Sequence, residues 1–319
     1  LANHLGISAS ALGLFVLSII TSLPELAVTL WAMVGENAPD LALGNIIGSN
    51  NFNLTCIVAL EATFGGVLLH RVGSARYLRT CVVLLLMTTL VGLGVLTGDI
   101  GAPALVHAMI FALPIVAVFV YDTMTHRGVM RANLPTGGTN SVRGDDATRK
   151  GLAGLTLRFA LLAAAVVAGG FLTAKGANGI AIHPFDRAGE PFTLGHTFVG
   201  SLLVAVATSM PEVSVAYSAV RRAASPDMAL GTLLGSNAIN ILVFIAGTPL
   251  LALRFSESAW RSVSEVNLVS VSAALLMTLM VMVGIASRRW RGGELVSRVS
   301  TTLLIPVYVI FVFLVYRWS

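Results

Sequence analysis

Long apolar stretches, each near the twenty residues that a helix needs to cross a bilayer, constrain this chain most. They account for a composition that is 56% hydrophobic and only 11% charged, with a mean hydropathy of +0.86. Inside lipid every backbone polar group must be satisfied internally, so these stretches form helices or a closed barrel. Barrel strands would alternate apolar and polar residues over short segments, which is not the pattern here. The sequence therefore predicts an all-α polytopic membrane protein whose surroundings are the lipid bilayer.

Charged residues and Gly/Pro clusters divide the chain into nine candidate spans. These cover residues 10–34, 40–69, 77–97, 102–122, 152–174, 194–220, 227–253, 266–286 and 300–316. The polar stretch 123–151 lacks periodicity and predicts a flexible linker between the membrane regions 1–122 and 152–319. The first region has four spans and the second has five, and residue 1 is Leu rather than Met. We therefore expect a fragment that lacks the first helix of a ten-span protein.

The basic residues indicate the orientation of the spans. When the loops are assigned alternately to the two sides, 15 of the 20 Lys and Arg residues fall on the side of the linker. Cytoplasmic loops carry an excess of Lys and Arg, so the linker 123–151 is expected to be cytoplasmic. The net charge of +5 comes from these short loops and gives no nucleic-acid signal.

An internal repeat relates the two regions. Residues 13–59 align without a gap with residues 200–246, at an offset of 187, and 17 of the 47 positions are identical. The shared positions include Thr21-Ser22-x-Pro24-Glu25 with Thr208-Ser209-x-Pro211-Glu212, and Gly48-Ser49-Asn50-x-x-Asn53 with Gly235-Ser236-Asn237-x-x-Asn240. Two unrelated apolar segments would share Leu, Val and Ala, but not polar clusters at matching spacing.

The repeat is expected to be inverted. With the missing helix restored, each copy has five spans, and an odd number places equivalent segments in opposite directions across the bilayer. The predicted architecture is an inverted-repeat helix bundle with a pseudo-two-fold axis in the membrane plane. In transporters built this way, the paired motifs meet near the midplane, where substrate binds.

Glu25 and Glu212 predict a cation or proton site. A carboxylate at the centre of a spanning helix costs about 2.5–3.5 kcal/mol, and no Lys or Arg lies near either residue in the repeat spans. Bound cations or protons would supply the compensating charge, although two neutral, hydrogen-bonded structural carboxyls are an alternative. A proline before each glutamate breaks the helix and frees carbonyls about one turn back. Such carbonyls and the neighbouring hydroxyls are the oxygen ligands that Ca²⁺ and Na⁺ prefer.

The second repeated motif, Gly48-Ser49-Asn50-x-x-Asn53 and its counterpart, combines glycines with polar side chains. Glycines four residues apart, such as Gly44 and Gly48, permit close helix approach, so a pure packing role is an open alternative. Packing does not explain the polar residues, because Ser49 and Asn53 lie on one helix face, as do their repeat counterparts. We expect these faces to present oxygens toward the carboxylate helices.

At these residues the chain resembles the calcium/cation antiporter superfamily, specifically the sodium/calcium exchanger branch with paired alpha repeats, in a prokaryotic-type form. The resemblance implies that Glu25, Glu212, Thr21 and Thr208 coordinate Ca²⁺. It assigns Na⁺ or neighbouring ion positions to Ser22, Ser209, Ser49, Ser236, Asn53 and Asn240, with backbone carbonyls from Ser18 and Ala205. It further implies Na⁺/Ca²⁺ exchange by alternating access, in the plasma (inner) membrane of a prokaryote.

The chain departs from the family pattern at a few positions. Ile20 and Ala207 replace a common glycine, and Thr232 stands opposite Asn45, so the two copies are not chemically equivalent. Proton-coupled relatives carry Gly-Asn-Ala-x-Glu, which is absent, so sodium coupling is expected. The alternatives are a Ca²⁺/H⁺ or other cation/H⁺ antiporter that uses the same glutamates, and a cation channel or non-transporting scaffold.

An enzyme is not expected, because the spans contain no paired catalytic aspartates, Ser/His pair or zinc motif. The transported ions are substrates, no cofactor is expected, and no obligate protein partner is inferred.

Overall fold

The computed structural model describes residues 18–63, 65–66, 68–72, 75–98, 100–132, 146–187, 190–222 and 225–319. Part of the first predicted span, 10–17, and part of the predicted linker, 133–145, lie outside the described residues.

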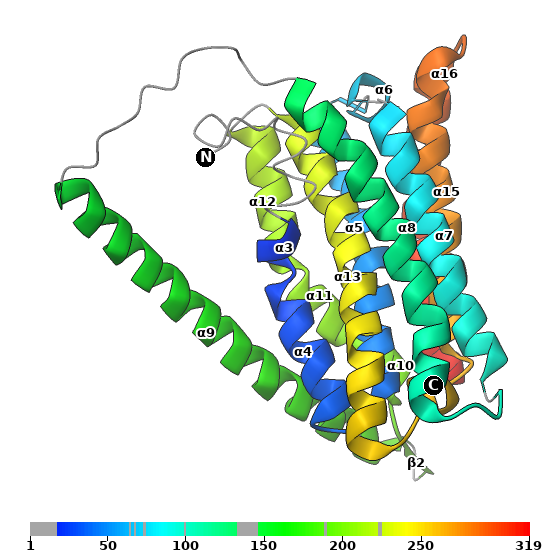
Figure 1. The fold of residues 1–319 in the computed structure, drawn as a ribbon. Coiled ribbons are helices and arrows are strands. Elements are labelled where there is room, and N and C mark those ends of the chain that lie inside the picture. The colour runs from blue at the N-terminus through cyan, green and yellow to red at the C-terminus, as the bar shows by residue number, and fades with distance from the viewer. Residues whose placement is uncertain are drawn as a thin grey trace.

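The described chain is a bundle of helices with one small hairpin (Figure 1). In the first half the helices are α3 (Ser18–Thr21), α4 (Leu23–Val34), α5 (Pro39–Thr63), α6 (Leu68–Val72), α7 (Ala75–Thr97) and α8 (Ala104–Ala132). In the second half they are α9 (Asp146–Ile182), α10 (His196–Phe198), the π-helix η2 (Val199–Val204), α11 (Ala205–Thr208), α12 (Met210–Arg221), α13 (Pro226–Phe255), α14 (Ala259–Ser262), α15 (Asn267–Ala286), the 3₁₀-helix η3 (Ser287–Arg289), α16 (Gly293–Thr302) and α17 (Leu304–Trp318).

Six helical stretches among the described residues are long and apolar enough to cross a membrane, and a bent pair formed by α10–α11 and α12 makes a seventh. The predicted number of nine is therefore not reached by length and apolar character alone. The two remaining predicted spans are 10–34, whose described part contains α3 and α4, and 40–69, which contains α5. Helix α5 has 25 residues and would extend about 37 Å, but its amide and hydroxyl side chains make it less apolar.

The two repeats run in opposite directions. In Figure 1, α3 and α4 descend, whereas α10, α11 and α12 rise; α5 then rises and α13 descends. These four segments pack against one another, and α7, α8 and α15 lie on one side of them, at the right of the picture (Figure 1). The arrangement of the described helices agrees with the predicted inversion.

Close backbone contact joins the two repeats at a glycine. A Cβ built on Gly48 of α5 would lie 2.4 Å from the carbonyl oxygen of Ser201 in η2, which only a hydrogen at that position tolerates. Gly44, one turn earlier, faces both α10 and η2, with its built Cβ 2.9 Å from the carbonyl oxygen of Thr197 and 3.2 Å from the backbone nitrogen of Ser201. The packing role left open for these glycines therefore exists, alongside the polar groups on other faces of α5.

Two parts of the fold differ from expectation. Helix α8 continues to Ala132 and α9 begins at Asp146, so helix occupies both ends of the range 123–151 expected to be a flexible linker. The chain is also not purely helical, because strands β1 (Phe185–Arg187) and β2 (Glu190–Phe192) pair antiparallel, with Phe185 opposite Phe192. This hairpin lies between the predicted spans 152–174 and 194–220.

Candidate cation site

Both carboxylate helices are interrupted at the same point of the repeated motif. Helix α3 ends at Thr21 and α4 begins at Leu23, with Ser22 between them at φ −81° and ψ 11°. Ser209 interrupts α11 and α12 in the same way, at φ −82° and ψ 0°. In each copy the proline is within the first two residues of the new helix, where a missing N–H costs no hydrogen bond. The glutamate follows it in the first turn, near the positive end of the helix dipole.

Each carboxylate is bonded by a hydroxyl of the other repeat. Ser209 Oγ donates to Glu25 Oε1 at 3.1 Å, and Ser22 Oγ donates to Glu212 Oε1 at 3.2 Å. Both glutamates are 0% exposed, and they are close enough for their charges to repel each other. The two motifs therefore meet in space as predicted, and each carboxylate accepts a hydrogen bond from the serine of the other copy.

A second set of hydroxyls also pairs across the two repeats. Ser49 Oγ lies 3.3 Å from Thr208 Oγ1, and Thr21 Oγ1 lies 3.3 Å from Ser236 Oγ. Ser236 Oγ also donates to Glu212 Oε1 at 3.3 Å. The serines of α5 and α13 therefore contact the broken helix of the opposite repeat, in line with the expectation that they present oxygens toward a carboxylate helix.

The predicted carbonyl ligands are already hydrogen-bonded. The Ala205 carbonyl accepts the backbone N–H of Ser209 at 3.1 Å and the Thr208 hydroxyl at 3.3 Å. The Ser18 carbonyl accepts the N–H of Ser22 at 3.0 Å and the Thr21 hydroxyl at 3.4 Å. The helix break therefore does not leave these two oxygens without donors, and an ion bound there would replace a side-chain donor.

Four asparagines form a layer where α5 crosses α13. Asn50 Nδ2 donates to the backbone oxygen of Asn237 at 3.1 Å, and Asn237 Nδ2 returns a bond to the backbone oxygen of Asn50 at 3.2 Å. Asn53 Nδ2 then donates to Asn237 Oδ1 at 3.0 Å, and Asn240 Nδ2 donates to Asn50 Oδ1 at 3.1 Å. These bonds use the amide nitrogens and leave the Oδ1 atoms of Asn53 and Asn240 without partners.

Four buried oxygens of these predicted residues have no hydrogen-bond partner. They are Glu25 Oε2, Glu212 Oε2, Asn53 Oδ1 and Asn240 Oδ1, and all four residues are 0% exposed. No Lys or Arg occurs in the ranges 18–63, 196–220 or 226–253 that supply the surrounding helices. Buried acceptors without donors are costly, and two of these belong to carboxyl groups. The arrangement suits a cation, or protons on the carboxyls.

The structure brings the predicted residues together around the two glutamates and the amide layer between α5 and α13. Sequence reasoning left Asn50 and Asn237 out of the site, although both are identical in the repeat and carried that signal. It also left out the pair formed by Asn45 and Thr29, whose counterparts are Thr232 and Ala216. A comparison of the repeats marks Asn45 as a departure, opposite Thr232, but gives no signal for its bond to Thr29, because that bond exists in only one copy.

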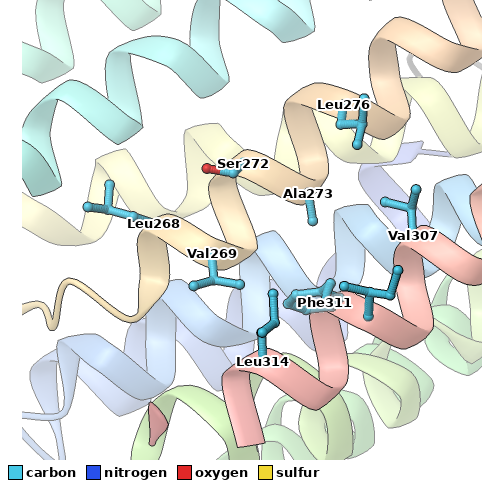
Figure 2. Close-up of a pocket in the computed structure, with 9 residues that line it drawn as sticks. Leu268, Val269, Ser272, Ala273, Leu276, Val307, Phe311 and Leu314 are labelled. Carbon is cyan, nitrogen blue, oxygen red and sulfur yellow. The ribbon is translucent and has the colours of Figure 1, made fainter. Parts of the chain in front are cut away.

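An apolar hollow elsewhere offers no comparable chemistry. It has a volume of about 430 Å³ and lies between α15 and α17, where Leu268, Val269, Leu276 and Phe311 line it (Figure 2). Ser272 is the polar side chain on its wall, and no carboxylate or amide is present. This hollow is not a candidate cation site.

Comparisons with known proteins agree with this geometry. The family model described as sodium/calcium exchanger protein matches residues 1–128 and 154–317. Inner membrane protein YrbG of Escherichia coli strain K12 is 26% identical over 325 residues, covering 100% of this chain and 90% of YrbG. Sodium/calcium exchanger MaX1 of Methanosarcina acetivorans is 31% identical over 118 residues, which are 35% of this chain and 31% of MaX1.

The fold also matches a solved structure. The sodium-calcium exchanger NCX_Mj, soaked with 10 mM Na⁺ and zero Ca²⁺, superposes with a TM-score of 0.58 over 97% of this chain and 88% of that chain, at 20% sequence identity. The family is one of integral membrane transporters rather than enzymes, and its members carry out cation antiport. With its family match spanning both halves, this chain belongs to the sodium/calcium exchanger family.

Proposed function

We propose that this protein is a secondary active antiporter that exchanges Ca²⁺ for Na⁺ at one site between Glu25 and Glu212. The observation that carries the proposal is the set of four buried, unpartnered oxygens on Glu25, Glu212, Asn53 and Asn240. These are hard oxygen ligands, which suit Ca²⁺ and Na⁺ better than softer metals.

The charge of the site supports competition between the two ions. The two carboxylates carry two negative charges and the asparagines carry none, so one Ca²⁺ would neutralise the site. Several Na⁺ ions could use the same oxygens together with the hydroxyls of Thr21, Thr208 and the neighbouring serines. Because both ions would need the same carboxylates, each would displace the other, and this is the physical basis of exchange.

Burial favours an exchanger over a channel. The residues with the unpartnered oxygens are 0% exposed, so in this conformation an ion between them would be closed off from both sides. A channel needs a continuous path, whereas an antiporter alternates between openings on either side of an occluded site. Hydrogen bonds between the inverted repeats provide two corresponding sets of contacts, one for each opening.

The membrane in which the protein lies, and its orientation there, are part of the same proposal. The chain is an integral membrane protein, and its relative YrbG is named as an inner membrane protein. We assign this chain to the plasma (inner) membrane of a prokaryote, with the linker 123–151 on the cytoplasmic side.

Proton coupling is the second candidate, because two protons on the glutamates would neutralise the site as well as one Ca²⁺. Proteoliposomes containing the full-length protein separate the candidates when pH is clamped on both sides. The proposal predicts ⁴⁵Ca²⁺ uptake driven by an outward Na⁺ gradient. Uptake that follows a pH gradient and ignores Na⁺ would replace Na⁺ coupling with H⁺ coupling.

Replacing either glutamate tests the site itself. At an effective dielectric of 20, unit charges 4 Å apart interact by about 4 kcal/mol, so Glu25→Gln or Glu212→Gln should weaken Ca²⁺ binding about a thousandfold. The variants should still fold, because Gln retains the Oε1 acceptor for the serine hydroxyl. Glu294→Gln, at an exposed position, is the matched control and should bind Ca²⁺ like the wild type. Ca²⁺ binding by E25Q within tenfold of the wild type would refute the central role of this carboxylate.

A further inference from the structure

The two halves of the site differ by one buried amide. Asn45 on α5 is 0% exposed and corresponds to Thr232 on α13 in the repeat. Thr29 on α4, also 0% exposed, corresponds to Ala216 on α12. Both differences occur together, so only one half contains an amide with a hydroxyl beside it.

Asn45 connects the helix of one glutamate to a hydroxyl of the other repeat. Its Nδ2 donates to Thr29 Oγ1 at 3.0 Å, which turns its Oδ1 the other way. Thr208 Oγ1 donates to that Oδ1 at 3.1 Å. Thr29 lies one helical turn after Glu25, and Thr208 ends α11 next to the break.

The direction of the Thr208 hydroxyl matters because it has a second acceptor at 3.3 Å, the carbonyl oxygen of Ala205, which is itself a predicted ion ligand. A hydroxyl has one proton and two lone pairs. When the proton points to Asn45, the lone pairs remain for a cation beside Glu25. When the proton points to the Ala205 carbonyl, it occupies an oxygen that the cation would otherwise use.

The opposite half lacks this device. The Thr232 hydroxyl donates to the carbonyl of Met228 in its own helix at 2.9 Å, and the Thr232 carbonyl accepts Ser18 Oγ at 3.2 Å. No amide oxygen stands at position 232, and Ala216 has no hydroxyl that could orient one.

We propose that Asn45, oriented by Thr29, is a positioning residue that holds Thr208 as an oxygen ligand and so raises the cation affinity of the half-site around Glu25. This inference rests on the proposed cation site and adds to it a reason why two repeats with matching motifs form unequal halves. Asn45 acts through Thr208 and does not itself need to contact the ion.

Asn45→Thr tests the proposal by installing the residue of the other repeat. Its hydroxyl can bond the carbonyl of Leu41, as Thr232 bonds that of Met228, so the fold should be retained. Equilibrium ⁴⁵Ca²⁺ binding to the purified full-length protein should weaken about tenfold, the factor expected when one ligand bond is lost. Thr232→Val is the matched control, since it removes only a bond within one helix, and it should change binding less than about twofold.

A double-mutant cycle separates positioning from general packing. Thr208→Val removes the hydroxyl through which Asn45 acts, so adding N45T to T208V should weaken binding by less than about twofold further. Unchanged binding in N45T, or an equal loss with and without the Thr208 hydroxyl, would overturn the inference while leaving the cation site standing. A wild-type protein that binds no Ca²⁺ would overturn both.

Discussion

The amide layer offers a sharp test, because two adjacent asparagines on α5 face different surroundings. Asn50 lies between the repeats, donating to Asn237 and accepting from Asn240. Asn51 points to α15 and donates to the carbonyl oxygen of Ser270 at 3.0 Å. Replacing each with leucine makes the same chemical change one residue apart.

The expected losses differ in kind. Asn50→Leu removes two buried side-chain hydrogen bonds and leaves Asn240 Nδ2 without an acceptor, which should lower the free energy of unfolding by about 2–4 kcal/mol. The amide of Asn240 would then turn to another acceptor, and the nearby unpartnered oxygens of the ion site are the ones available. Ca²⁺ binding should weaken at least about tenfold, because a donor would occupy a cation ligand.

Asn51→Leu removes one hydrogen bond but also removes a buried acceptor, Asn51 Oδ1, that has no partner. These effects oppose each other, so the free energy of unfolding should change by about 1 kcal/mol or less. Ca²⁺ binding should stay within about twofold of the wild type. Urea or thermal unfolding and ⁴⁵Ca²⁺ binding measure the two quantities on the same samples. Equal Ca²⁺ affinities in N50L and N51L would refute the assignment of the amide layer to the ion site.

Two further substitutions test the packing that supports the site. Gly48→Ala would place a methyl group 2.4 Å from the Ser201 carbonyl oxygen and should lower the free energy of unfolding by about 2 kcal/mol or more. The control is Gly179→Ala on α9, whose added methyl meets nothing within 4 Å and should leave the stability unchanged or raise it. Equal melting temperatures of the two variants would contradict the close approach of α5 and η2. Tyr77→Phe removes the 2.6 Å bond from the phenol to the backbone oxygen of Asp227, so stability should fall by about 1 kcal/mol with Ca²⁺ affinity unchanged, and a loss of affinity would show that this bond reaches the site.

The repeat made much of this site predictable from the sequence. The fixed offset identified the two glutamates and their neighbouring hydroxyls, and counting spans indicated that the copies are inverted. The contacts between the repeats were harder to predict from the sequence. Spacing along one helix shows which residues share a face, but it does not show which repeat that face contacts. Ser49 shares its repeat with Glu25, yet its hydroxyl lies beside Thr208 of the other copy.

Other features depended on information that a repeat cannot carry. Asn45 and Thr29 form a bond across α4 and α5 that exists in one copy only, so a search for identical positions passes over both. The polar composition of 123–151 indicated a linker, but its ends contain residues that helices accept, and α8 and α9 extend into it.

The hydrogen bonds between the two repeats have a mechanical consequence. Glu25 is bonded by Ser209 and Glu212 by Ser22, so each half of the site combines a carboxylate of one repeat with a hydroxyl of the other. If one repeat moves relative to the other, both halves must change at once, since neither is contained within a single moving unit. A cation that draws all these oxygens together therefore favours the arrangement in which both halves are closed. Its release requires the repeats to separate on one side, which is the coupling between ion binding and conformation that an antiporter needs.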